Sequence, residues 1–266
     1  MLEAREIRLN LRGRDLLRGV SLSLAPASLA CLIGPNGAGK TLLLETLAGL
    51  RRPSSGEALL EGKPVWKLSP DARARKLAFL QQRSQFFFPF PVEEVVAMGC
   101  FSTSSCSPLE IMDRVGILKL RESLFTEISE GERRMVLVAR VLAQGTDFLL
   151  LDEPASNLDI KNQVAIYKIL EEAAQEGKTV LVSEHNLSLA TLCQQVYLIA
   201  RGEIKERGVP REVLNEENIR EVFGISTSDL PGLTFDPQGF PGPDSQYKPA
   251  GKKAGLPFPG PDGLPD

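Results

Sequence analysis

The residues with the clearest chemical meaning form a glycine-rich segment, positions 34–41, which reads GPNGAGKT. This segment fits the pattern G-x-x-x-x-G-K-[ST], and it lies between an apolar stretch and a run with helical spacing. Glycines let main-chain N–H groups turn toward phosphate oxygens, and a helix N-terminus adds the positive end of its dipole. Lys40 would then reach the β- and γ-phosphates, and the Thr41 hydroxyl would face Mg²⁺. The pattern predicts a nucleoside-triphosphate site.

Two carboxylates form the second candidate group. Asp152 and Glu153 end the apolar run LLLDE at positions 149–153, and ligands bind where parallel strands end. An apolar strand followed by acids is common by itself, but its combination with the phosphate-binding loop favours hydrolysis. We predict that Asp152 lies on the Mg²⁺ side and that Glu153 acts as general base on the attacking water.

Three further positions can complete such a site. The sole histidine, His185, follows the apolar run TVLVS, and Gln82 follows LAFL; each could be an ordinary surface side chain, but each stands just past a predicted strand. His185 is therefore expected to contact the γ-phosphate and Glu153, and Gln82 to contact metal or water. Ser129 is a good N-cap for the helix that follows it.

The order of these segments resembles the ABC transporter ATP-binding family. ISEGERR at 128–134 is similar to the family's LSGGQ signature, SNLD at 156–159 to its D-loop, Gln82 to its Q-loop glutamine and His185 to its switch histidine. With the loop and the two acids, six elements occur in the family's order. The resemblance implies MgATP hydrolysis by a homodimer, in which the signature segment of one chain touches the nucleotide bound by the other.

The resemblance also assigns roles to individual residues, and some residues have more than one. The catalytic set is Lys40, Gln82, Glu153 and His185, and the metal-binding set is Thr41, Gln82 and Asp152. The nucleotide-binding set is Gly34, Pro35, Asn36, Gly37, Ala38, Gly39, Lys40, Thr41, Leu42, Ser129, Gly131 and Asp159.

Three positions depart from the family pattern. Leu11 stands where an aromatic usually stacks on adenine, Leu42 replaces a common second hydroxyl, and Glu130 replaces the first signature glycine. Glu130 would disfavour a phosphate nearby unless it points to solvent. Weaker or less selective nucleotide binding could follow, so a degenerate nucleotide-binding regulator is one alternative.

Other segments resemble the ATPases of importers for iron siderophores, heme and cobalamin, with heme uptake as the best match. These segments are PFPVEEVVAMG, RVLAQG and ENIREVFGI. The phenylalanines Phe86, Phe87, Phe88 and Phe90 follow Gln82 closely, and they predict either core packing or an apolar surface for the helices of a membrane permease. A soluble ABC ATPase without a transport partner would share the six motifs and is a second alternative.

The predicted fold class is α/β, a P-loop NTPase of ABC type. A mixed sheet core is expected to carry an N-terminal antiparallel β layer and a helical subdomain at about 90–145. The ATPase domain is assigned to residues 1–228. The segment 229–266 is rich in proline and glycine and repeats FPGPD, so it is predicted to be a disordered tail.

Composition limits the remaining function classes. The chain has 266 residues, 42% of them hydrophobic, and a net charge of −3, so no nucleic-acid partner is expected. No secretory signal or membrane span is predicted. We therefore expect a cytoplasmic protein, peripheral on the cytoplasmic face of the cell membrane. The cysteines lack C-x-x-C spacing and are expected to be reduced structural thiols rather than zinc ligands.

Overall fold

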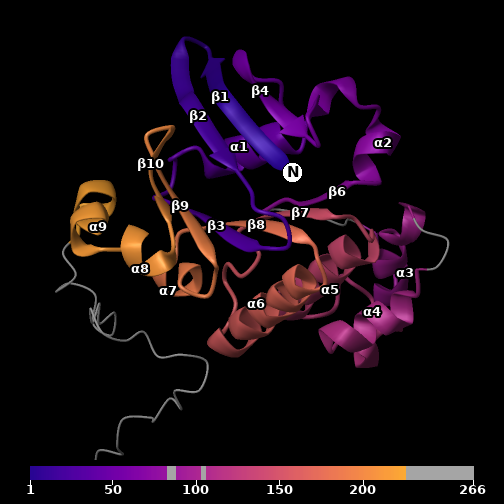
Figure 1. Cartoon of the computed structure of the whole chain (residues 1–266). Helices are drawn as coiled ribbons and strands as arrows, with labels where there is room; N and C mark the ends of the chain where they lie inside the picture. Colours follow the sequence, from indigo (N-terminus) through magenta and orange to yellow (C-terminus); the bar gives the residue numbers. More distant parts are fainter. Residues whose placement is uncertain (83–87, 103–105, 226–266) are drawn as a thin grey trace, which may run out of the picture.

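The computed structural model describes residues 1–82, 88–102 and 106–225, and it contains two sheets (Figure 1). The smaller sheet is antiparallel, with strand order β2-β1-β4-β5. It corresponds to the predicted N-terminal layer. Its strands are β1 (Leu2–Leu11), β2 (Arg14–Ser23), β4 (Ser55–Leu60) and β5 (Lys63–Pro64).

The larger sheet has the order β10-β9-β3-β8-β7-β6 and is parallel except for β10, which pairs antiparallel with β9. The predicted mixed sheet is confirmed. Parallel pairing brings the carboxyl ends of β3, β6, β7 and β8 to one edge, where the predicted site residues follow. The strands are β3 (Leu29–Ile33), β6 (Leu77–Leu80), β7 (Phe148–Asp152), β8 (Thr179–Glu184), β9 (Gln195–Ala200) and β10 (Glu203–Gly208).

The central strand β3 shows why this sheet is covered on both faces. Its alternate residues belong to two different apolar cores, Cys31 and Ile33 to one and Ala30 and Leu32 to the other. Continuous apolar runs are typical of parallel strands buried on two sides. One core lies toward α1 and the antiparallel sheet, and the other toward the long helices α5 and α6 (Figure 1).

The helices follow the predicted arrangement. Between β6 and β7 the chain forms a helical arm of α3, α4 and α5, which lies on the side of the large sheet away from the antiparallel layer (Figure 1). The α-helices are α1 (Lys40–Leu47), α2 (Pro70–Ala74), α3 (Val92–Ala97), α4 (Pro108–Val115), α5 (Glu130–Ala143), α6 (Ile160–Gln175), α7 (Leu187–Ala190), α8 (Pro210–Val213) and α9 (Glu216–Phe223). Short 3-10 turns are η1 (Val65–Lys67), η2 (Cys100–Ser102) and η3 (Leu118–Leu120).

The expectation of four reduced thiols is wrong for one pair. Cys100 and Cys106 form a disulfide with their Cα atoms 5.4 Å apart, whereas Cys31 and Cys193 are free and buried. Sequence spacing was a poor guide because these two cysteines, six residues apart in the chain, do not form a C-x-x-C pattern.

The boundary predicted at residues 228 and 229, and the proline-rich segment that follows, lie outside the described residues. The domain division therefore stays a prediction. No helix in the described ranges is both long and apolar enough to cross a bilayer.

Candidate active site

Residues 34–41 connect β3 to α1 at the carboxyl edge of the large sheet, and two of their glycines are sterically required. Gly39 is the N-cap of α1 with φ of 106°, a conformation that suits glycine. A Cβ on Gly34 would lie 2.0 Å from the carbonyl oxygen of Ile199. The close approach of β9 therefore fixes where this loop begins.

Lys40 extends back over the loop. Its side chain is buried, and Nζ donates hydrogen bonds to the carbonyl oxygens of Gly34 at 2.7 Å and Pro35 at 3.2 Å. Burial lowers the pKa of the Lys40 ammonium, while the carboxylates of Glu153 and Asp152 oppose that shift. A cation is thus held over the loop by neutral carbonyls that can be exchanged for phosphate oxygens.

Asp152 is buried beneath the loop and bonded to two hydroxyls. Thr41 Oγ1 donates to Oδ2 at 2.8 Å, and the Ser183 hydroxyl donates to Oδ1. Burial raises the pKa of Asp152, and the bonds from Ser183 and Thr41 act against that rise. These are hard oxygen donors of the kind that Mg²⁺ prefers. The described residues contain no group of three or more His, Cys, Asp or Glu suited to a metal.

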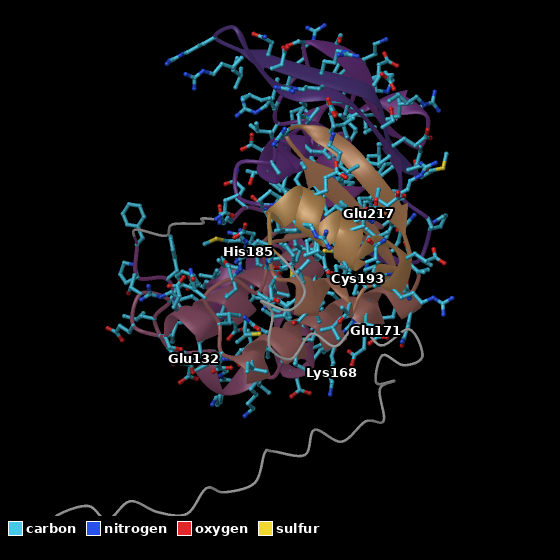
Figure 2. All side chains as sticks on the ribbon, turned by 90° about the vertical axis from the view of Figure 1, so that its left-hand side faces the viewer. Glu132, Lys168, Glu171, His185, Cys193 and Glu217 are labelled. Carbon is cyan, nitrogen blue, oxygen red and sulfur yellow. A yellow bond between two sulfur atoms is a disulfide. The ribbon has the colours of Figure 1, made fainter. Side chains whose placement is uncertain are left out.

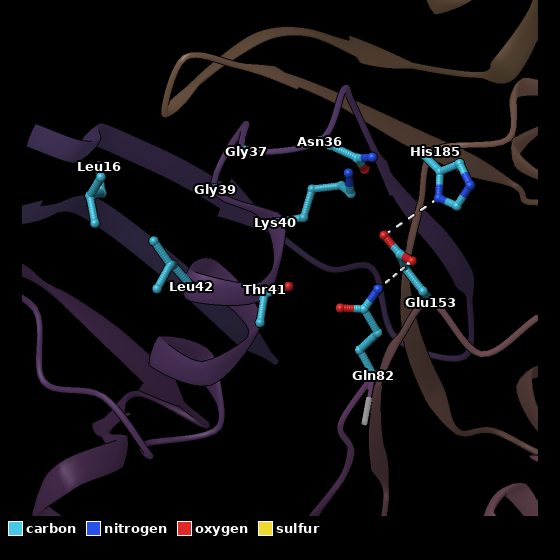
Figure 3. A pocket seen from close by; sticks show the side chains of 10 residues that line it. All are labelled: Leu16, Asn36, Gly37, Gly39, Lys40, Thr41, Leu42, Gln82, Glu153 and His185. Carbon is cyan, nitrogen blue, oxygen red and sulfur yellow. Dashed lines mark hydrogen bonds and ion pairs between the residues drawn. The ribbon is translucent and has the colours of Figure 1, made fainter. Parts of the chain in front are cut away.

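Glu153 is the residue on which the other predicted catalytic groups converge (Figure 3). Gln82 Nε2 donates to Glu153 Oε2 at 2.7 Å, and His185 Nδ1 lies 3.4 Å from Oε1. The Glu153 side chain is 10% exposed and that of His185 is 47% exposed. The Glu153 backbone has φ of 46° and its N–H donates to Ser183 Oγ at 3.0 Å. A non-glycine residue held in this region is costly, a feature common at functional sites.

These groups line one pocket of 370 Å³. In Figure 3, Leu16 and Leu42 lie at one end, and Gln82, Glu153 and His185 lie at the other. Leu16 is the one lining residue that the sequence reasoning missed, because a leucine after a turn carries no chemical signal. The lining residues are Leu16, Asn36, Gly37, Gly39, Lys40, Thr41, Leu42, Gln82, Glu153 and His185.

The remaining predicted nucleotide contacts do not line the pocket. Gly34, Pro35 and Ala38 belong to the loop itself, and the predicted metal ligand Asp152 is also absent from the lining. Ser129 caps α5 in a reciprocal box with Glu132, and Asp159 caps α6 by accepting from the N–H of Asn162 at 2.8 Å.

The first residues of the signature segment, Ser129 and Gly131 among them, do not line this chain's pocket. Glu132 and His185 are well separated in Figure 2, and a Cβ on Gly131 would meet Asn162 Nδ2 at 3.1 Å rather than any pocket residue. Ser129, Gly131 and Asp159 are therefore not gathered with the phosphate-binding loop in one chain.

Two of the departures from the family pattern have a structural outcome. The Glu130 side chain is 74% exposed and lies 3.9 Å from Arg133, so its charge faces solvent. Leu11 is exposed and does not line the pocket. Neither residue blocks the site.

Sequence reasoning also missed three buried polar residues around the site. Ser183 joins Asp152 to the Glu153 main chain, and Arg134 bonds to the loops that follow β6 and β7. Glu184 accepts from Tyr167 OH at 3.0 Å. Burial raises the pKa of Glu184 to about 7. In the sequence, the signal that could have drawn attention to Glu184 is its place at the end of an apolar run, directly before the sole histidine.

The aromatic segment after Gln82 is described in part. Phe88 is 68% exposed, and Phe90 packs against the core with its ring centroid 6.1 Å from that of Phe88. Met98 and Phe101, just past α3, are exposed as well. The predicted positions Phe86 and Phe87 lie outside the described residues.

Comparison with known proteins places these features in a wider context. The family model described as ABC transporter matches residues 17–156. The Hemin import ATP-binding protein HmuV of Rhizobium meliloti (strain 1021) is 33% identical over 84% of this chain and 91% of its own length. Its namesake in Bordetella avium (strain 197N) is 35% identical, with 86% and 94% covered. The Cobalamin import ATP-binding protein BtuD of Halobacterium salinarum (strain ATCC 29341 / DSM 671 / R1) is 35% identical over 80% of this chain and 56% of its own.

Solved structures agree on the fold. An ATP-binding subunit of an ABC transporter superposes with a TM-score of 0.72 at 20% identity, covering 86% of this chain and 97% of that one. A dimeric ATP-binding cassette bound to ADP and Pi gives 0.69 at 22% identity, covering 79% and 99%. At this identity the likeness concerns the fold alone.

Proposed function

This chain belongs to the ABC transporter family, and from that premise we propose that it is the ATP-binding and ATP-hydrolysing subunit of an importer for heme or a related iron- or cobalt-containing cargo. The proposal of ATP hydrolysis rests on one observation: a single pocket is lined by Lys40, Gln82, Glu153 and His185. The relatives named as hemin and cobalamin import ATP-binding proteins carry the transport part.

The proposed mechanism assigns each pocket residue a contact. Lys40 exchanges the carbonyls of Gly34 and Pro35 for the β- and γ-phosphate oxygens of ATP. Glu153 accepts the proton of the attacking water, with Gln82 holding one of its carboxylate oxygens and His185 beside the other. Leu16 and Leu42 form the apolar end, where the base would lie.

Magnesium fits the oxygen donors beside the loop. The Thr41 hydroxyl and the Asp152 carboxylate would hold it, and Gln82 would approach it from the opposite loop. When bound, Mg²⁺ would supply positive charge beside the phosphates and would offset the negative charge that develops during hydrolysis. Thr41 Oγ1 lies 2.8 Å from Asp152 Oδ2, so the two oxygen donors stand side by side.

A second copy of the chain completes the proposed site. Ser129, Gly131 and Asp159 lie away from the pocket of their own chain, so they are available to the nucleotide of a partner subunit. The capped N-terminus of α5 offers main-chain N–H groups to an anion. Glu130 leaves this approach open because its side chain faces solvent.

The proposed membrane partner is a permease that docks beside Gln82, on the surface that includes Phe88 and Phe90. Phe88 is 68% exposed, and exposed apolar side chains that gather in one patch favour a partner surface. With such a partner, the subunit would lie on the cytoplasmic face of the membrane.

The test of hydrolysis is the variant Glu153→Gln. The amide keeps the shape of the side chain but cannot accept the proton, so kcat for phosphate release should fall about 10²- to 10⁴-fold while ATP still binds. Glu171→Gln is the matched control because Glu171 is exposed on α6 and does not line the pocket. Phosphate release by Glu153→Gln at the wild-type rate would remove Glu153 from the role of base.

The test of cargo is growth of the source organism after deletion of this gene. Loss of growth with hemin as the sole iron source, restored by the wild-type gene and not by Glu153→Gln, supports heme import. Loss of cobalamin-dependent growth instead would assign the other cargo, and no change in either would contradict a role in this uptake.

A further inference from the structure

Arg134, near the start of α5, has the most heavily bonded buried side chain near the site. It is 6% exposed. Nε donates to the carbonyl oxygen of Pro154 at 2.8 Å, and Nη2 donates to those of Asp152 and Glu153, both at 2.7 Å. Nη1 donates to the carbonyl oxygens of Gln81 at 3.3 Å and Gln82 at 3.2 Å. All five acceptors are main-chain carbonyls.

Four of these carbonyls belong to the two loops that carry the pocket residues Gln82 and Glu153, and the fifth, that of Asp152, ends β7. The loops leave the neighbouring parallel strands β6 and β7, whose last paired residues are Leu80 and Leu151. Beyond that pair the strand ladder no longer fixes one chain segment against the other. The planar guanidinium, with its N–H groups in a rigid fork, takes over that function.

Arg134 carries its charge into a buried position near four carboxylates. Burial lowers the pKa of Arg134, and the carboxylates of Asp152, Glu184, Glu130 and Glu153 act in the opposite direction. Arginine stays protonated in proteins. A lysine would bring one point charge with three donors and could not span both loops in the same geometry.

The next residue offers a comparison within the same helix. Arg133 also bonds to main-chain carbonyls, with Nε donating to Phe125 at 3.1 Å and Nη2 to Thr126. Those carbonyls lie in the segment that precedes α5 and carry no pocket residue. Arg133 therefore ties α5 to the segment that precedes it, whereas Arg134 ties α5 to the loops that carry Gln82 and Glu153.

We propose that Arg134 is a positioning residue for ATP hydrolysis: it holds the loops of Gln82 and Glu153 in register and ties both to the helix whose first turn carries Ser129 and Gly131. The inference rests on the proposed function. It adds a rigid link between the pocket of one subunit and the α5 terminus that faces the nucleotide of the other. Arg134 does not line the pocket, so the link acts on the turnover step rather than on binding.

The experiment compares steady-state MgATP hydrolysis by the full chain in the wild type, Arg134→Lys, Arg134→Ala and the control Arg133→Lys. Displacement of positioned groups by about 1 Å can cost about 10²-fold in rate. We expect kcat to fall about 10-fold for Arg134→Lys and about 100-fold for Arg134→Ala, with KM for ATP within about threefold of the wild type. Arg133→Lys should lose less kcat than Arg134→Lys, because the bonds of Arg133 join α5 only to the segment before it.

A chemical rescue separates positioning from general damage to the fold. Guanidinium chloride below denaturing concentrations should restore part of the kcat of Arg134→Ala, since the ion can occupy the vacated site, and equal NaCl should not. If Arg134→Ala fails to fold, Arg134→Lys alone decides the matter through the split between kcat and KM. A wild-type kcat in Arg134→Lys, an equal loss in Arg133→Lys, or a loss confined to KM would overturn the inference. A wild type that releases no phosphate would instead refute the proposed function, and this inference with it.

Discussion

Glu184 is the strongest electrostatic anomaly near the site, and its effect on stability can be worked out. The carboxyl is 1% exposed, accepts a hydrogen bond from Tyr167 OH at 3.0 Å and lies among groups that include Lys40 and Glu153. Burial raises its pKa from 4.5 to about 7. We predict that Glu184→Gln removes a pH dependence of folding that this carboxyl creates.

The sign follows from proton binding in the two states. Below pH 4.5 the folded and unfolded chains both hold the proton, so Glu184 contributes nothing to the pH dependence. Between 4.5 and about 7 only the folded chain keeps it, so the free energy of unfolding falls as pH rises. Above a pH of about 7 the Glu184 carboxyl is ionised in both states, and the free energy of unfolding stays lowered by the full amount. One pKa unit corresponds to about 1.4 kcal/mol, so the total cost is on the order of 3 to 4 kcal/mol.

The assay is urea unfolding of the wild type, Glu184→Gln and Glu171→Gln at several pH values from 5 to 8.5. Glu184→Gln should gain up to about 3 to 4 kcal/mol over the wild type as pH rises, because a neutral amide can still accept from Tyr167 OH without burying a charge. Glu171→Gln, at an exposed position on α6, should follow the wild-type slope. Parallel curves for the wild type and Glu184→Gln would refute the buried-charge reasoning.

Two other predictions concern the helical arm. Ser129→Ala removes the hydroxyl that accepts from the N–H of Glu132, so it should lower the free energy of unfolding by about 1 kcal/mol in urea titrations. Ser107→Ala, at the equivalent cap of α4, should lower it by a similar amount and leave phosphate release unchanged. An unchanged free energy of unfolding in Ser129→Ala would contradict the cap. The Cys100–Cys106 disulfide predicts that the denatured, unreduced protein titrates as two thiols and the reduced protein as four; four thiols before reduction would show that the bond is absent.

The sequence by itself determined the parts of the site that depend on short stretches of chain. The phosphate-binding loop forms between β3 and α1 because its glycines accept backbone angles and contacts closed to other residues, as Gly39 and Gly34 illustrate. The capping box at Ser129 spans three residues and is equally local. The continuous apolar runs before Asp152 and His185 also identified parallel strands correctly.

Only the tertiary structure decided how distant segments meet. Gln82 reaches Glu153 across 71 residues, and Arg134 reaches the Gln81 and Pro154 carbonyls across 53 and 20. Such contacts depend on strand order and on how α5 packs, which no local pattern encodes. The same holds for Leu16 in the pocket and for the bond between Cys100 and Cys106. Side-chain types carried the chemistry of this site, whereas its geometry came from the shared edge of the parallel sheet and the buried guanidinium that fastens two of its loops.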